Sequence, residues 1–202
     1  MPSDARFTAL LLAGGRSSRM GTDKARLLHP VTGLPLLDHQ AALLTFVPGC
    51  AELLLSAPAE RAYTLSGPLS QARVIPDAAP DCGPLAGLVA GLAAATHSRL
   101  LVIAVDLPFL TAEFLQTLLD GSNSAVGLVP RHADGTFEPL CAVYPVHSTA
   151  RAACADALAA RHYSLQKLLS TACSSGWMRP HPIAAASLPH LANWNTPADL
   201  AR

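Results

Sequence analysis

The sequence of 202 residues lacks an excess of charge of either sign, because 14 Lys and Arg residues balance 14 Asp and Glu residues. Such a chain has no global field that would favour nucleic acid or an anionic membrane, so any anion site must be local. It also lacks an apolar run long enough for a membrane span or a signal peptide near its N-terminus. We therefore expect a soluble, cytoplasmic protein with neither nucleic acid nor a membrane as partner.

The cysteines and histidines lack a metal-binding or redox pattern. No C-x-x-C pair occurs, and no histidine follows at zinc-ligand spacing. The five cysteines are Cys50, Cys82, Cys141, Cys154 and Cys173. We interpret them as reduced thiols. The nearest approach to a histidine pattern, His181 with His190, lies in a proline-rich segment with few strand signals, so we expect no histidine metal site.

Internal repeats, low-complexity runs and a long linker are also missing, which predicts one domain over residues 1–202. Apolar segments favouring strands alternate with helical patterns, and this alternation predicts a three-layer α/β/α sandwich around a mainly parallel sheet. The expected strands are 7–12, 52–56, 73–75, 100–105, 126–129 and 140–144. The expected helices are 37–46, 85–96 and 111–119, with Thr111 as a cap and Pro84 in a first turn. A polar hairpin at 131–138 breaks the alternation, and the chain is mostly helical from Ser148 onward.

The most informative segment is residues 12–24, LAGGRSSRMGTDK, which follows the first apolar strand. Glycines let backbone N–H groups approach an anion closely, and Arg16, Arg19 and Lys24 supply positive charge. The segment is not a Walker loop, because five residues separate Gly15 from Gly21, and G-x-G-x-x-G does not occur. The pattern favours a polyphosphate cradle over the alternative of a tight turn with solvated cations.

Two carboxylates follow other expected strands. Asp77 comes after the strand at 73–75, and Asp106 after the apolar run 100–105. Ligands of parallel α/β sheets bind outside the carboxyl ends of the strands, where both would lie beside Gly14. The alternative for each is a turn or capping role. Asn195, Thr196 and Pro197 likewise suit a helix start, so capping is the leading interpretation there.

Taken together, these residues resemble the molybdenum cofactor guanylyltransferases, the MobA-like branch of the nucleotidyltransferases. The resemblance rests on five blocks that span nearly the whole chain: Leu-Ala-Gly-Gly at 12–15, the segment 17–24, Asp77 with Gly-Pro-Leu-Ala-Gly at 83–87, Asp-Leu-Pro-Phe-Leu at 106–110, and NWNTPADL at 193–200. It implies a Rossmann-like nucleotidyltransferase fold with GTP and molybdopterin as substrates, Mg²⁺ as cofactor, and contacts with molybdoenzymes or their chaperones.

The resemblance also implies a role for each site residue. The backbone of Leu12, Ala13, Gly14 and Gly15 would hold phosphates and base, and Lys24 would contact the phosphates. Asp77 would face the nucleoside, and Asp106 would bind Mg²⁺. Asn193 or Asn195 would reach the acceptor or the metal. Ser56 stands where the family often has an asparagine, so it offers one hydroxyl in place of an amide at the base site.

Nucleotidyl transfer needs positioning and cations more than a nucleophilic side chain. We expect the terminal phosphate of molybdopterin to attack the α-phosphorus of GTP, with pyrophosphate leaving under Mg²⁺, Arg19 and Lys24. Two rival functions remain at this point. One is a related transferase that uses CTP or another phosphorylated acceptor, and the other is a nucleotide-binding protein without catalysis.

Overall fold

The structure is a computed structural model that describes residues 5–13, 24–58, 63 and 65–194. Seven strands in this part form one sheet, in the order β3-β2-β1-β4-β6-β5-β7. The strands are β1 (Phe7–Leu12), β2 (Cys50–Ala57), β3 (Arg73–Pro76), β4 (Arg99–Ala104), β5 (Gly127–Arg131), β6 (Cys141–Pro145) and β7 (Met178–Pro182). β6 is antiparallel to both of its neighbours, whereas the other pairings are parallel. The prediction of a mainly parallel sheet is confirmed.

The two central strands explain why the sheet has a core on each face. Every residue of β1 and β4 is buried. Successive side chains of a strand point to opposite faces, so Leu11 and Ile103 join one apolar cluster while Leu10 and Val102 join the other. An apolar run buried on both faces is typical of parallel strands covered by helices.

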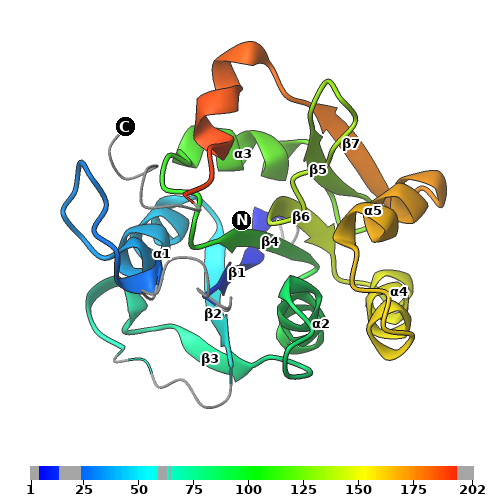
Figure 1. The fold of residues 1–202 in the computed structure, drawn as a ribbon, viewed down its shortest axis with the longest axis horizontal. Coiled ribbons are helices and arrows are strands. Elements are labelled where there is room, and N and C mark those ends of the chain that lie inside the picture. Colours follow the sequence, from blue (N-terminus) through cyan, green and yellow to red (C-terminus); the bar gives the residue numbers. More distant parts are fainter. Residues whose placement is uncertain (1–4, 14–23, 59–62, 64, 195–202) are drawn as a thin grey trace.

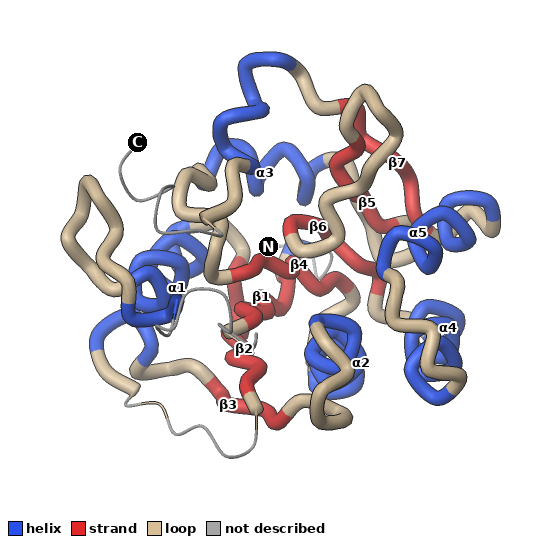
Figure 2. The backbone as a smooth tube through the Cα atoms, viewed as in Figure 1, coloured by secondary structure: helices blue, strands red, loops and turns tan. Residues whose placement is uncertain are grey.

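Helices cover both faces of the sheet, as a three-layer architecture requires (Figures 1 and 2). One face carries α1 (Leu36–Phe46) and α3 (Ala112–Asp120), and the other carries α2 (Pro84–Ala94), α4 (Ser148–Ala159) and α5 (Leu165–Ser174). Three 3₁₀ helices, η2 (Lys24–Arg26), η3 (Gly67–Leu69) and η4 (Ala185–Leu191), complete the described elements. No helix in the described ranges is long and apolar enough to cross a bilayer.

Local sequence signals determine where the helices begin. The side chain of Thr111 accepts a hydrogen bond from the backbone N–H of Phe114, which confirms it as the cap of α3. Pro84 lies in the first turn of α2, as expected. A Cβ at Gly91 of α2 would collide with the side chain of Leu10, so this glycine lets the helix lie unusually close to β1.

The sequence predicts no strand in the proline-rich segment near His181. This prediction is wrong, because residues Met178–Pro182 form the edge strand β7. Trp177 accepts a backbone hydrogen bond from Gly127, and Ile183 donates one to Arg131. Because alternate residues of a strand face the partner, Pro180 and Pro182 occupy positions whose nitrogens face away from β5. Proline is tolerated at such edge positions, and this explains why a strand forms despite the composition.

The cysteines are free thiols, as the sequence predicted. Burial raises the pKa of Cys50 to about 11 and that of Cys154 to about 12, so both stay protonated at neutral pH. No group of three or more His, Cys, Asp or Glu side chains in the described residues could hold a metal ion.

Candidate functional site

The carboxyl ends of four parallel strands bring the predicted site residues to one edge of the sheet. Leu12 at the end of β1 pairs with Ser56 of β2 on one side and with Ala104 of β4 on the other. Ala13 donates a backbone hydrogen bond of 3.0 Å to the carbonyl of Ser56, and Val105 donates one of 3.2 Å to the carbonyl of Leu12. These bonds align the ends of the strands.

Asp77 and Asp106 follow two of these strands, at the same edge. Asp77 donates its backbone N–H to Ala57 at 3.1 Å, which places it directly after β3 beside β2. The glycines and arginines of the expected phosphate loop, Gly14, Gly15, Arg16 and Arg19, lie outside the described residues, as does the expected helix start at Asn195, Thr196 and Pro197. Their roles stay predictions.

Lys24 and Asp106 form an ion pair at the end of β4. The Nζ atom of Lys24 lies 3.0 Å from Oδ2 of Asp106, and the two side chains are 20% and 23% exposed. Lys24 opens η2, so 82 residues of chain separate two groups that the sheet edge brings together. The pair is accessible enough for a ligand to reach both charges.

The Asp106 carboxylate has room for a hard cation. Within the described part of the chain its side chain accepts one hydrogen bond, from Lys24 on Oδ2, and none on Oδ1. Mg²⁺ usually takes one or two protein carboxylates and fills its remaining positions with water and substrate oxygens. A single carboxylate beside the expected phosphate loop therefore fits this ion.

Ser56 and Asp77 form a second polar pair. The hydroxyl of Ser56 is buried and donates to Oδ1 of Asp77 at 2.5 Å. A Cβ at Gly87 of α2 would lie 2.6 Å from Cδ2 of Leu12 and 2.9 Å from the Ser56 hydroxyl. The beginning of α2 therefore packs against this pair. Ser56 positions the carboxylate of Asp77, and its direct contact with a base stays a prediction.

The C-terminal segment reaches the Asp106 loop. Trp194 donates its backbone N–H to the carbonyl of Asp106 at 2.9 Å, and its ring meets that of Phe109 edge-on at 5.8 Å. Asn193 lines the same pocket as Asp106. The position of Asn193 is therefore consistent with the prediction that this segment lies near the carboxylate expected to bind the metal.

A buried amide and an imidazole support the loop after Asp106, and the sequence analysis did not identify either one. Gln40 of α1 donates through Nε2 to the carbonyl of Leu107 at 2.5 Å. Nε2 of His29 lies 3.0 Å from the carbonyl of Pro108, while its Nδ1 accepts the N–H of Thr32 at 3.2 Å. His29 therefore carries its proton on Nε2 and donates it to the loop.

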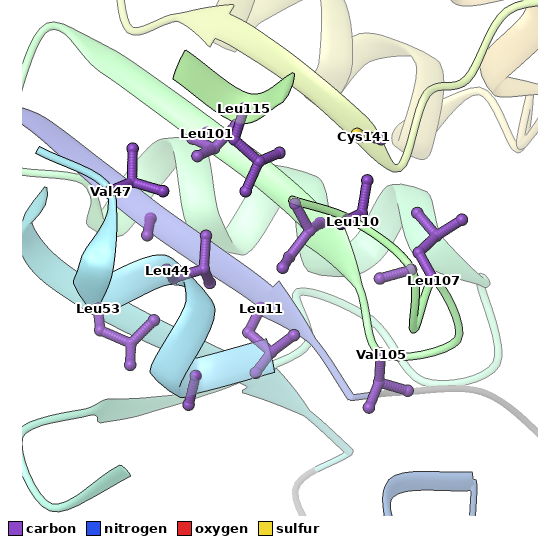
Figure 3. Close-up of a cluster of buried hydrophobic side chains, with 14 of the residues drawn as sticks. Leu11, Leu44, Val47, Leu53, Leu101, Val105, Leu107, Leu110, Leu115 and Cys141 are labelled. Carbon is purple, nitrogen blue, oxygen red and sulfur yellow. The ribbon is translucent and has the colours of Figure 1, made fainter. Parts of the chain in front are cut away.

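The ring of His39 stacks on that of His29. The rings of His29 and His39 are 3.8 Å apart, and burial, together with repulsion from His29, lowers the pKa of His39. Apolar side chains anchor the loop from below, since Val105, Leu107 and Leu110 lie in the same buried cluster as Leu11 (Figure 3). The position of Asp106 thus depends on packing and on the hydrogen bonds from Gln40 and His29.

An open pocket of about 440 Å³ lies between the Asp106 loop and the hairpin that joins β5 to β6. The lining residues are Asp106, Leu107, His132, Asp134, Thr136, Phe137, Glu138, Pro139, Leu140, Gln166 and Asn193. The sequence marked this hairpin only as a break in the strand-helix alternation. The hairpin lies beside Asp106 because β6 runs antiparallel to β4. Ala104, at the end of β4, donates its backbone N–H to the carbonyl of Leu140, just before β6, at 2.9 Å.

Comparison with known proteins identifies relatives over most of the chain. A model of the MobA-like NTP transferase domain matches residues 9–175. A probable molybdenum cofactor guanylyltransferase of Opitutus terrae is 34% identical, with 94% of this chain and 90% of that protein covered. A protein with the same description from Nostoc is 36% identical, with 96% and 89% covered.

Solved structures share the fold. The molybdopterin-guanine dinucleotide biosynthesis protein A of Archaeoglobus fulgidus superposes with a TM-score of 0.67 at 24% identity, covering 96% of this chain and 95% of that one. The 2-C-methyl-D-erythritol 4-phosphate cytidylyltransferase of Thermus thermophilus gives 0.71 at 17% identity, with 97% and 96% covered. At these identities the likeness establishes the α/β architecture alone.

Proposed function

Because the chain belongs to the MobA-like NTP transferase family, we propose that this nucleotidyltransferase transfers GMP from GTP to the terminal phosphate of molybdenum-bound molybdopterin. The products are the guanine dinucleotide cofactor and pyrophosphate. The observation that carries the proposal is the Lys24–Asp106 pair, which lies at the end of β4 and beside an open pocket. Asp106 follows β4 at the strand ends proposed for the nucleotide, and it also lines the pocket proposed for the acceptor.

The chemistry needs no nucleophilic side chain. A phosphate monoester has a second pKa of about 6, so it is largely dianionic near neutral pH. One of its oxygens forms a new bond to the α-phosphorus of GTP, and the bond between the α-phosphorus and the bridging oxygen breaks. Pyrophosphate leaves with that electron pair, so atoms and charge balance without a general base.

The residues of this chain supply position and charge. Asp106 would hold Mg²⁺, which, when bound, would neutralise charge on the phosphates. Lys24 would release Asp106 to the cation and place its ammonium on the phosphates, with Arg19 as the proposed second cation. The backbone of Leu12 and Ala13, continued by Gly14 and Gly15, would cradle the phosphates, and Asp77 would face the nucleoside.

The test is pyrophosphate release by the purified full chain with molybdopterin and Mg²⁺, comparing GTP with CTP. We expect release with GTP and loss of it when EDTA removes the metal. Preference for CTP would move the protein to the cytidylyl branch, a result for which the single hydroxyl of Ser56 leaves room. Nucleotide binding without turnover would assign it to the non-catalytic alternative. Cytoplasmic residence and contacts with molybdoenzymes or their chaperones stay predictions.

A further inference from the structure

The wall of the pocket opposite Asp106 carries a histidine–carboxylate pair. Nε2 of His132 lies 2.6 Å from Oε1 of Glu138, and the side chains are 27% and 18% exposed. A carboxylate oxygen facing an imidazole accepts, so His132 donates through Nε2–H. The other oxygen of Glu138, Oε2, has no hydrogen-bond partner among the described residues. The pair thus presents a partly buried, oriented acceptor to the pocket.

The hairpin that carries this pair is held firmly. Within it, His132 donates its backbone N–H to Thr136 at 2.8 Å, and Glu138 donates to Pro130 at 2.9 Å. Gln166 of α5 binds both backbone groups of Phe137, accepting its N–H at 2.9 Å and donating to its carbonyl at 2.8 Å. Because hydrogen bonds already fix this backbone, ligand binding costs little further conformational entropy. A side chain on it can therefore select a ligand by geometry.

The lining of the pocket suits a flat heterocycle. Leu107, Phe137, Pro139 and Leu140 supply apolar surface for such a ring. The polar lining comes from the Asp106 loop with Asn193, from the hairpin and from Gln166 of α5; the hairpin contributes His132, Asp134, Thr136 and Glu138. A volume of about 440 Å³ lies within the range of small-ligand sites, roughly 300–1,000 Å³. The end at Asp106 must receive the reacting phosphate, because the transfer takes place there. The other end of a bound acceptor therefore extends toward the hairpin.

We propose that Glu138, oriented by His132, recognises the 2-amino-4-oxopyrimidine edge of the pterin in the acceptor. This edge presents a ring N–H beside an exocyclic NH₂, two parallel donors that a carboxylate can accept together. The inference rests on the proposed function, since it takes molybdopterin as the acceptor. It assigns specificity for the acceptor to the hairpin between β5 and β6, which carries none of the residues proposed for the nucleotide.

Glu138→Gln is the first test, because the substitution keeps the shape and turns one acceptor into a donor. We expect the KM for molybdopterin to rise on the order of 10-fold or more, since a hydrogen bond to a charged group is lost. The KM for GTP stays within about twofold of the wild-type value, because none of the residues proposed for the nucleotide lies on the hairpin. Glu113→Gln is the matched control, because it makes the same chemical change at an exposed position in the first turn of α3, and Glu113 does not line the pocket. An equal rise in both variants, or none in Glu138→Gln, would overturn the assignment.

A second measurement needs no variant and no turnover. Fluorescence titration of the wild-type protein compares 6-hydroxymethylpterin with 6-hydroxymethyllumazine, in which a carbonyl replaces the 2-amino group. We expect the pterin to bind about 10-fold more tightly, since the carbonyl would face Glu138 as a second acceptor. Equal affinities would overturn the proposal. Discrimination without GMP transfer would leave the pterin assignment intact and refute the proposed function, whereas transfer without discrimination would do the reverse.

Discussion

Two carboxylates at opposite edges of the same sheet have opposite surroundings. Glu52, near the start of β2, lies 2.6 Å from Arg73 through one oxygen. Its other oxygen accepts from the hydroxyls of Thr8 and Thr96, each at 2.8 Å, and from the Thr96 N–H at 3.1 Å. Asp106, after the end of β4, accepts from Lys24 alone among the described residues. One carboxylate is fully used by the fold, and the other retains capacity for a ligand.

The number of hydrogen bonds that a carboxylate accepts distinguishes a structural charge from a functional one in this protein. At the amino edge, the carboxylate joins β2 to β3 and to the segment before β4, so it helps to hold the sheet together. At the carboxyl edge, Asp106 is supported through its backbone and its loop, and its oxygens remain accessible. We therefore expect substitutions at the two positions to separate stability from activity.

Asp106→Asn should have the largest effect. We expect pyrophosphate release to fall on the order of 100-fold or more, because the amide cannot offer the charge that a cation requires at the transferring phosphate. The midpoint of thermal unfolding should change little, since packing and backbone contacts place the loop. Asp120→Asn, at an exposed end of α3, is the control and should retain full activity. Wild-type release from Asp106→Asn would disprove the mechanism.

Glu52→Gln should reverse this outcome. The substitution removes the ion pair with Arg73, and the new amide NH₂ faces the groups of Arg73, Thr8 and Thr96 that donate hydrogen bonds to the carboxylate. We therefore expect a loss of about 2 kcal/mol in the free energy of unfolding. At a temperature where the variant is folded, its rate of transfer should match the wild type. Urea denaturation measures the first quantity and the pyrophosphate assay the second. Asp156→Asn, on the exposed surface of α4, should change neither.

The pH dependence of stability gives the smallest and most specific effect. Burial opposes ionisation of Glu52, but the hydrogen bonds from Arg73, Thr8 and Thr96 outweigh it and lower the pKa to about 2 from an ordinary 4.5. The stabilisation is complete above pH 4.5 and is lost as the pH falls toward 2, because the unfolded chain binds the proton first. Urea titrations between pH 5 and pH 2.5 should show a steeper loss for wild type than for Glu52→Gln. Parallel curves would show that Glu52 does not act through its charge.

Much of the fold could be predicted from the sequence because its signals are local. The apolar runs of β1 and β4, the Thr111 cap and the first-turn Pro84 each report on their own neighbourhood. β7 was missed because its prolines are acceptable only on an edge strand, and edge position is a property of the whole sheet.

The candidate site divides in the same way. Lys24, Asp77 and Asp106 follow recognisable strands and motifs, and the structure places them at one edge. Gln40 and the His132–Glu138 pair carry no motif of their own. Their positions depend on how α1 packs over the Asp106 loop and on the reversal of direction at β6, neither of which leaves a local pattern.

The central position of β1 in the sheet affects folding during synthesis on the ribosome. This strand needs β2 on one side and β4 on the other, and Leu12 finds its second partner only at Ala104. At about 5–20 residues per second, a ribosome delivers β4 roughly 5–20 seconds after β1. During that interval the nascent chain exposes a strand that is apolar except for Thr8 and has an open edge, a template for aggregation. Chaperone supply and growth temperature should therefore govern the yield of folded protein.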